Sequence, residues 1–546
     1  MNWKFFRVPL LAGALLIGLA GIAGAAPAPW PTLSSQLAGV PTGSALERLI
    51  RANQDFSLLA ADEAQDQRGL PLWLRVWWRK GNPAPALAAT DPTRGYPHAL
   101  KEILEWMMSH PDLKVPPPGP SFGPEAWNAV IGGDKRISGA QTTPRSESDV
   151  RINFNNGSQI LAASNNISAS GRQAQFYSLD GGATWGQTEL PLALRDSFHS
   201  DPAVDWTSDG VGWAMTLGIR GNTLAARAYR STDGGATWTF DGTPSGSQKA
   251  VDKELMWVDH SASSPFRNNI YTCYHNNNPA YVGRRTSAGW QAAVQVSGSE
   301  STGTAIGCDI KTNSAGDVFA FWPTTGNSRI VVRKSTTGGA SYVPAVVVAT
   351  TFDSYDIGVP SFNSRRALIY TSGAAYRTAT QNLVCVAWTD LSGDSGCTAP
   401  ANEPGSSVAS ACKTRVWTSR SLDGGATWSA PARVNHQTSK NDQFNQWLAV
   451  DETSGRFGLM YYDTVADPGR LKTDVYYQSS IDCSSWSAPL KVTTAMTDET
   501  QSTANLGNQY GDYNGLSGFL GKFFPSWTDR RTGGKEEIWT APISDP

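Results

Sequence analysis

The most constraining feature of this 546-residue chain is an octapeptide that occurs three times. Residues 178–185 read SLDGGATW, residues 231–238 read STDGGATW and residues 421–428 read SLDGGATW. The composition is that of a tight turn, because the Asp carboxylate can accept backbone N–H groups and the glycines supply positive φ angles. The closing Trp provides a large apolar side chain that can pack beneath the turn. Three near-identical copies indicate a repeat architecture.

Weaker copies lie between the intact ones, at residues 284–290, 335–342 and 480–486. The closing aromatic residues stand at positions 185, 238, 290, 342, 428 and 486, so successive copies are 53, 52, 52, 86 and 58 residues apart. The period is therefore about fifty residues with one large insertion, which is the length of a four-stranded propeller blade.

From residue 132 onward the pattern is all β. Innermost strands are expected at 149–152, 201–205, 255–259, 306–309, 447–451 and 512–515. Second strands are expected at 159–164, 212–217, 269–274, 318–322, 382–388, 457–462 and 522–527. Seven repeats over these 415 residues give about 59 residues each, whereas six would give about 69, which is long for a blade. We predict an all-β, seven-bladed β-propeller, with six blades as the alternative, closed by a strand from residues 134–140 that pairs its last edge.

The N-terminal region differs from the repeats. Residues 1–25 have a basic start, an apolar run and a small-residue cleavage site, which is the pattern of a secretory signal peptide. The apolar run is too short for a membrane span to be favoured. Residues 26–131 contain two helical apolar stripes and a Pro-rich linker, and they predict a small helical extension ahead of the propeller at 132–546. We expect a secreted or periplasmic protein.

Cysteines and charge restrict the function further. All six cysteines follow the signal peptide, and an even number in an oxidising compartment permits three disulfides, with Cys397–Cys412 and Cys273–Cys308 the expected pairs. The net charge of −2 gives no basic field for nucleic acid. We expect no nucleic-acid partner and a monomer.

The octapeptide resembles the Asp-box, or bacterial neuraminidase repeat, of the sialidase-like β-propellers. That resemblance implies that the boxes are structural turns between the third and fourth strands, away from the face that carries the site. Asp-boxes also occur in other glycosidases, polysaccharide lyases, sorting receptors and assembly factors, so the resemblance bears on the fold more than on activity.

Candidate site residues are polar side chains in loops that enter an innermost strand or leave a second strand, since propeller sites usually lie there. As a group they could bind or cleave an anionic or polyhydroxylated ligand. The candidates for catalysis are Arg151, Asp201, Glu254, His275, Tyr462, Asp512, Tyr513, Asp529 and Arg530. The candidates for substrate binding are His199, Arg220, Lys253, Gln446 and Arg531. The alternative for each is a structural role, because Asp at a strand end often accepts backbone N–H groups.

The family resemblance implies three arginines on a substrate carboxylate, an Asp acid/base and a Tyr nucleophile activated by a Glu. Residues 150–153 read VRIN where the family has Phe/Tyr-Arg-Ile-Pro, so Arg151 is present but the aromatic residue and the Pro are not. Asn165 and Asn166 stand about where the acid/base Asp would follow.

The leading prediction is a sialidase-like glycoside hydrolase whose partner is an extracellular glycan or polysaccharide. Three alternatives stay open. One is a polysaccharide lyase with a Tyr or His base, and another is a non-catalytic propeller that binds glycans or proteins. The third is a metal-assisted hydrolase in which Asp252, Glu254 and Asp512 supply a Ca²⁺ site. No cofactor is expected, although a structural Ca²⁺ is possible. The sequence does not identify the residues that would bind a metal.

Overall fold

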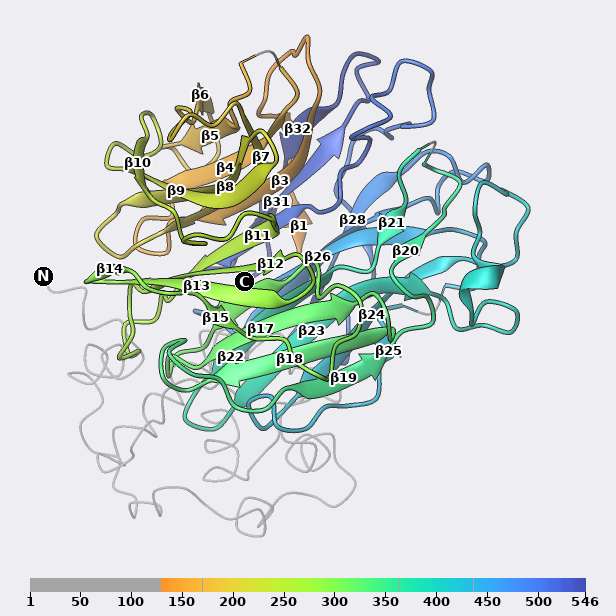
Figure 1. Ribbon diagram of the computed structural model, residues 1–546. Helices are drawn as coiled ribbons and strands as arrows, with labels where there is room; N and C mark the ends of the chain where they lie inside the picture. Colours follow the sequence, from red (N-terminus) through yellow and green to blue (C-terminus); the bar gives the residue numbers. More distant parts are fainter. Residues whose placement is uncertain (1–128, 169, 363, 436) are drawn as a thin grey trace, which may run out of the picture. The chain divides into compact units, whose positions relative to one another are not determined.

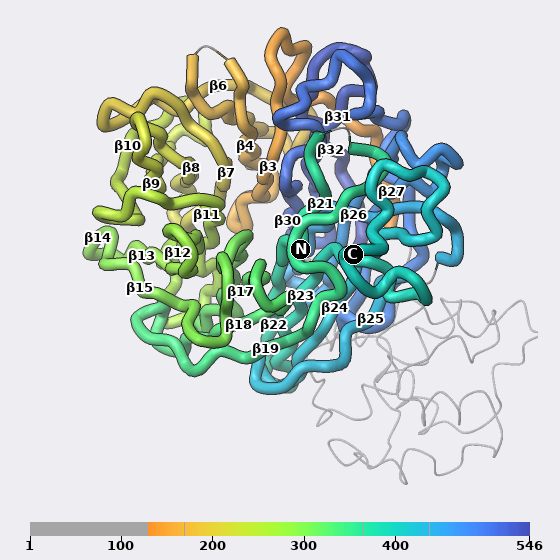
Figure 2. Tube along the Cα trace, turned by 45° about the vertical axis from the view of Figure 1, so that its right-hand side comes forward, coloured from red at the N-terminus to blue at the C-terminus, as the bar shows by residue number. Residues whose placement is uncertain are grey.

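The computed structural model describes residues 129–546 except 169, 363 and 436. These residues form one compact unit. Seven antiparallel sheets, each built on four strands, are arranged around a central axis as a β-propeller (Figures 1 and 2). The seven-bladed prediction is confirmed. The predicted signal peptide and helical extension fall on residues 1–131, of which 1–128 lie outside the described residues, so both stay predictions.

The blades follow one another along the chain. Blades 1 and 2 are β3 (Arg145–Ile152), β4 (Ile160–Asn166), β5 (Ala174–Ser178) and β6 (Gly186–Glu189), then β7 (Phe198–Trp206), β8 (Gly212–Arg220), β9 (Thr223–Ser231) and β10 (Thr239–Gly242). Blades 3 and 4 are β11 (Val251–Val258), β12 (Ile270–Asn276), β13 (Ala280–Thr286), β14 (Gly289–Trp290) and β15 (Val294–Gln295), then β16 (Asp309–Thr312), β17 (Val318–Thr324), β18 (Arg329–Ser335) and β19 (Val346–Thr350). Blades 5 and 6 are β22 (Thr371–Arg377), β23 (Asn382–Leu391), β24 (Thr414–Ser421) and β25 (Ala432–Arg433), then β26 (Gln443–Asp451), β27 (Arg456–Asp463), β28 (Asp474–Ser480) and β29 (Leu490–Lys491). The second strands lie where the sequence predicts them, to within about three residues.

Blade 7 closes the ring with strands from both ends of the described chain. It contains β30 (Gly515–Phe519), β31 (Lys522–Asp529) and β32 (Glu537–Thr540), and β2 (Lys135–Arg136) pairs antiparallel with β32. The predicted closure by residues 134–140 is therefore confirmed. β1 (Val130–Ile131) and β33 (Ile543–Ser544) add a further pair to this blade. The first and last blades lie side by side in Figure 2, and β2 supplies the outermost strand of blade 7.

Buried side chains hold neighbouring blades together around the axis. A carboxylate or hydroxyl oxygen of one innermost strand accepts a backbone N–H of the innermost strand of the next blade, at N···O distances of 2.7–3.1 Å. The acceptor and donor pairs are Asp149 with Val204, Asp205 with Val258, Asp309 with Gly373, Ser372 with Leu448, and Ser517 with Ile152. Because a buried charge needs such partners, these bonds fix both the carboxylates and the spacing of the strands.

The octapeptide turns join the third strand of a blade to the fourth, as expected. In the first copy, Ser178 Oγ accepts the backbone N–H of Gly182 at 2.8 Å, and Asp180 Oδ1 accepts that of Thr184 at 2.8 Å. Gly182 has φ of 85°, and a Cβ there would lie 2.6 Å from the ring of Phe524. Glycine is therefore required both for its backbone angle and for space. These turns lie on the rear face of the propeller, whereas the chain enters each innermost strand on the opposite, front face.

The large insertion belongs to the front face. It consists of residues 351–370, with the small sheet of β20 (Asp356–Ile357) and β21 (Ala367–Leu368), and residues 392–413, with the short 3-10 helix η4 (Pro400–Asn402). Cys397 and Cys412 form a disulfide across the second loop, as predicted. The predicted bond between Cys273 and Cys308 is also present, and Cys385 pairs with Cys483.

The three disulfides are typical of a protein that folds in an oxidising, non-cytoplasmic compartment. Of the helices within the described residues, none has the length and apolar character needed to cross a membrane.

Candidate functional site

Four innermost strands begin on the front face with a β-bulge that holds a non-glycine residue at positive φ. These residues are Glu147, Asp201, Lys253 and Asn445, with φ of 53°, 52°, 54° and 47°. The first three are 54 and 52 residues apart, so they occupy the same place in successive blades. A left-handed backbone costs a non-glycine residue about 1–2 kcal/mol. Such strain concentrates at functional sites, and bulges serve there to redirect side chains.

The bulges bring several ionisable groups together at the front end of the axis. We call Glu147, Asp201, Asp252, Lys253 and Tyr513 the front cluster. Lys253 is 2 % exposed, and its Nζ lies 3.0 Å from the centroid of the Tyr513 ring. This ammonium group has no hydrogen-bond partner among the described residues, so its stabilisation comes from the ring and from the surrounding carboxylates.

Asn165 connects the side chain of Glu147 to the backbone of Asp201. Its Nδ2 donates to Glu147 Oε2 at 2.6 Å, and its Oδ1 accepts the backbone N–H of Asp201 at 2.8 Å. The other oxygen of Glu147 accepts the backbone N–H of Asp512 at 3.2 Å and lies 3.7 Å from Arg365 Nη2. Glu147 is 4 % exposed and Asp201 is 8 % exposed. The carboxyl group of Asp201 accepts the hydroxyl of Ser200 at 2.8 Å, so both carboxyl groups have a hydrogen-bond partner and are largely shielded from water.

The electrostatics of the front cluster favour a protonated acid near neutral pH. Burial raises the pKa of Glu147 to about 7, and the charge of Asp201 adds to this rise while Arg365 and Lys253 oppose it. Burial lowers the pKa of Lys253 to about 8, although the neighbouring carboxylates favour its charged form. A carboxyl group with a pKa near neutrality is suited to donate a proton to a leaving group.

Two further predicted residues border this cluster. Glu254 is fully buried, neither of its oxygens has a hydrogen-bond partner within the described residues, and burial raises its pKa. His275 Nε2 lies 3.9 Å from Asp252 Oδ2, and burial lowers the pKa of His275 to about 4. At neutral pH the pair therefore consists of a neutral imidazole and a carboxyl group at the rim, whose side chain is half exposed.

Other predicted residues hold the fold around the front face and do not join the front cluster. Tyr462 packs between Phe444 and Tyr510, and its Oη donates to the carbonyl of Thr528 at 2.7 Å. Gln446 donates from Nε2 to the carbonyl of Tyr370 at 2.9 Å. Both side chains are buried because their polar atoms find partners within the blades.

The nominated residues of the closing blade are engaged in ion pairs and backbone bonds. Arg531 Nε donates to Asp529 Oδ2 at 2.8 Å, and its Nη1 bonds Asp134 beside the closing strand. Arg530 Nη1 donates to the carbonyl of Asp498 at 2.8 Å. These contacts stabilise blade 7. They hold the side chains of Asp529, Arg530 and Arg531 against the loops next to that blade.

Three more candidates lie apart from the front cluster. His199 is buried beside Tyr229, and burial lowers the pKa of His199 to about 4. Arg220 is exposed, and its Nη1 donates to the carbonyl of Leu194. Arg151 stands at the other end of β3, where it lines a cavity that opens on the rear side.

Sequence reasoning missed Glu147, Arg365 and Tyr370. Glu147 precedes the expected start of its strand, but its spacing from Asp201 and Lys253 repeats the blade period and could have identified it. Arg365 and Tyr370 come from the first inserted loop. The position of this loop on the front face was the one feature that could have linked them to the site. Lys253 Nζ lies 5.1 Å from the centroid of the Tyr370 ring, so the insertion forms part of the wall of the site.

No group of three or more His, Cys, Asp or Glu residues suited to a metal ion occurs in the described part of the chain. Asp252, Glu254 and Asp512, which the metal-assisted alternative would use for Ca²⁺, therefore do not form such a group.

No protein-family model matches this chain, and no curated protein matches it in sequence. Among solved structures, a protein of unknown function from Dyadobacter fermentans has 13% identity and a TM-score of 0.43, with 77% of this chain and 99% of that chain covered. The GH93 α-L-arabinofuranosidase of Fusarium graminearum, in complex with arabinobiose, has 11% identity and a TM-score of 0.42, with 76% and 97% covered. The leech intramolecular trans-sialidase has 11% identity and a TM-score of 0.42, with 64% and 70% covered. These similarities are too distant to assign the chain to a family.

Proposed function

We propose that this protein is an exported glycoside hydrolase whose reaction site is the front cluster. The observation that carries the proposal is the placement of three ionisable residues, Glu147, Asp201 and Lys253, on strained bulges at the same position of successive blades. Strain that recurs at one end of the axis, on residues that can move or neutralise charge, is typical of a reaction centre.

The chemistry follows from two carboxyl groups of neighbouring blades, Glu147 and Asp201, whose residues are linked by Asn165 through the side chain of the first and the backbone of the second. Glu147, with its raised pKa, donates a proton to the glycosidic oxygen as that bond breaks. The carboxylate of Asp201 then faces the developing positive charge of the sugar ring, either directly or through a water molecule. The charge of Asp201 favours the ammonium form of Lys253, so a buried cation lies beside the two carboxyl groups.

A two-carboxylate scheme fits this site better than the sialidase scheme. The sialidase scheme needs three arginines around one substrate carboxylate, but the nominated arginines are dispersed. Arg151 lines the rear cavity, Arg220 is exposed beside Leu194, and Arg530 is bonded within blade 7. Lys253 and Arg365 are the cations that accompany the front carboxylates.

Export is supported by the disulfides and by the N-terminal sequence. A polymeric glycan outside the cytoplasm is a substrate that such a protein can reach. The side chains of Asp252 and Arg365 are partly exposed, and they are positioned to contact sugar units next to the bond that is cleaved.

The test is a turnover screen of the purified protein on sialosides, arabinans, uronate polymers and neutral glycans. We expect release of reducing sugar from at least one class, lost in Glu147→Gln and Asp201→Asn. Glu189→Gln is the matched control, since Glu189 lies at the end of the outermost strand of blade 1. Unsaturated products, detected by their ultraviolet absorbance, would instead indicate a lyase. Binding without turnover of any glycan would indicate a non-catalytic propeller.

A further inference from the structure

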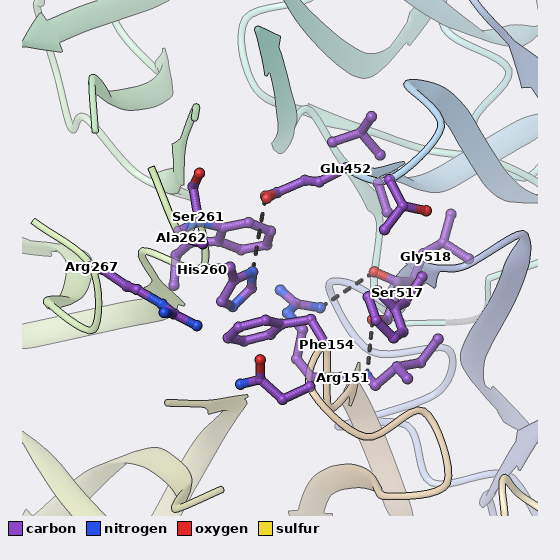
Figure 3. Close-up of a pocket in the computed structure, with 17 residues that line it drawn as sticks. Arg151, Phe154, His260, Ser261, Ala262, Arg267, Glu452, Ser517 and Gly518 are labelled. Atoms are coloured by element: carbon purple, nitrogen blue, oxygen red, sulfur yellow. Dashed lines mark hydrogen bonds and ion pairs between the residues drawn. The ribbon is translucent and has the colours of Figure 1, made fainter. Parts of the chain in front are cut away.

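A cavity of about 260 Å³, whose lining residues are drawn in Figure 3, opens on the rear side of the propeller, away from the front cluster. Innermost strands and rear loops of blades 1, 3, 6 and 7 form its wall. Its apolar surface comes from Phe154, Trp257, Leu516 and Phe519, among others. Its volume is close to the lower limit of ordinary ligand pockets, so it suits a ligand built on a single ring.

His260 is fixed at one side of this cavity. Its Nε2 lies 2.8 Å from Asp205 Oδ1, and its ring stands between Phe154 and Trp257, with centroids 4.0 Å and 4.6 Å away. Asp205 also accepts two backbone N–H groups, which fix its side chain so that it holds the proton of His260 Nε2 toward itself. The other ring nitrogen, Nδ1, is therefore left for the cavity.

Glu452 faces His260 across a gap. Its Oε1 lies 3.9 Å from His260 Nδ1, which is too far for a hydrogen bond (Figure 3). Burial raises the pKa of Glu452 to about 7, so its carboxyl group can donate as well as accept near neutral pH. A ligand hydroxyl placed between the two groups could bond to both.

Two arginines give the cavity its cationic character. Arg151 is 4 % exposed, and its Nη1 donates to Asp149 at 2.9 Å while its Nε has no hydrogen-bond partner in the described part of the chain. Arg267 is exposed, its side chain extends toward His260 in Figure 3, and it forms no ion pair within the described residues. A buried, unsatisfied donor and an unpaired guanidinium group are both suited to accept an anion.

We propose that the rear cavity is a binding site for a sugar acid, a single polyhydroxylated ring that carries a carboxylate. In this site Arg267 pairs with the carboxylate, and a ring hydroxyl bridges His260 Nδ1 and Glu452. The apolar face of the ring packs against Phe154 and Phe519. The lining also offers the polar side chains of Asn155 and Thr453 for further hydroxyls. A purely apolar anion would leave these polar groups unpaired, which is costly in a shielded site. The site is separate from the front cluster, and the proposal does not depend on turnover.

The test measures binding of sodium D-glucuronate to the intact protein by calorimetry, with D-glucose and benzoate as comparison ligands. We expect one saturable glucuronate site, with weaker binding of both comparison ligands. Arg267→Ala should weaken glucuronate binding about tenfold or more, because it removes a charge-assisted bond. The matched control is Arg230→Ala, an exposed arginine on the outer part of blade 2.

Glu452→Gln sharpens the assignment of the polar contact, and it should weaken glucuronate and glucose alike. Glu147→Gln should leave glucuronate binding unchanged, which separates this site from the proposed reaction site. The proposal is overturned if glucuronate does not bind, if benzoate binds as tightly, or if Arg267→Ala and Arg230→Ala behave alike. Thermal unfolding of each variant establishes that the fold is retained.

Discussion

The front and rear ends of the propeller axis are built from the same strands, yet they differ in backbone and in space. β3 contributes Glu147 to the front cluster and Arg151 to the rear cavity, four residues further along the chain. At the front, bulges hold ionisable side chains at positive φ and burial shifts their pKa values. At the rear the innermost strands are regular and surround an open volume of about 260 Å³. The difference indicates two purposes, since proton transfer needs fixed, shielded charges whereas binding needs room.

The largest expected effect is a loss of turnover that follows from a substitution at the front end and not from one at the rear. Glu147→Gln removes the proton donor but keeps the size of the side chain, so turnover should fall by about 10²–10⁴-fold. Arg267→Ala should leave turnover of short substrates within about twofold, because its side chain is at the rear. The measurement is kcat on the best substrate of the screen. Equal losses in the two variants would contradict the separation of the two ends.

A second prediction concerns the backbone of the front end. Gly307 has φ of 63° just before β16, and a Cβ there would overlap the ring of Tyr370. Gly307→Ala should therefore cost the left-handed penalty of about 1–2 kcal/mol, and a further ~1–3 kcal/mol for overpacking. Gly210→Ala is the matched control, because Gly210 has φ of 81° and a Cβ there would meet nothing within 4 Å. Denaturant unfolding measures both, and equal losses would show that Tyr370 moves away freely.

The sequence predicts the ring well because repetition encodes it. Turns that recur every fifty residues locate the blades, and the apolar second strands follow from simple patterning. The sequence predicts two innermost strands too early in the chain. The predicted strands end at Asp309 and Gly515, which are the residues at which β16 and β30 begin in the structure. Gly307 and Gly511, with φ of 63° and 73°, interrupt the extended backbone just before these strands.

The site is predicted less completely, because side-chain direction depends on bulges that residue types do not reveal. Arg151 and Glu147 lie on one strand, but only the register of that strand shows which end each serves. The partners Arg365 and Tyr370 come from an insertion without a repeat pattern, so only their front-face position links them to the site.

The third prediction is that stability and turnover depend on pH through the buried carboxyl group of Glu147 at the front end. The folded pKa of Glu147 is about 7, above the ordinary value of 4.5, so the folded state holds this proton more tightly than the unfolded state. Its contribution to stability is fully present below about pH 4.5 and is lost as pH rises through 7. Melting temperatures of the wild type should therefore fall, relative to those of Glu147→Gln, across this range. Turnover should fall above pH 7 for the same reason, and parallel melting curves for the two proteins would refute the raised pKa.

The smallest expected effect concerns a turn on the rear face. The pKa shift there is downward, so the stability changes with pH in the opposite direction to that of Glu147. Hydrogen bonds from the hydroxyl and the backbone N–H of Thr184 lower the pKa of Asp180 to about 2, below the ordinary value of 3.8. Its contribution to stability is therefore present above about pH 3.8 and lost as pH falls through 2. Asp180→Asn should lower the melting temperature at pH 6 by only about a degree, because the carboxylate is exposed. The difference from the wild type should shrink as the pH approaches 2.

The same change at Asp423, whose carboxylate accepts the matching bonds from Thr427, should behave in the same way. A difference that persists undiminished at pH 2 would mean that the turn depends on the shape of the side chain rather than on its charge.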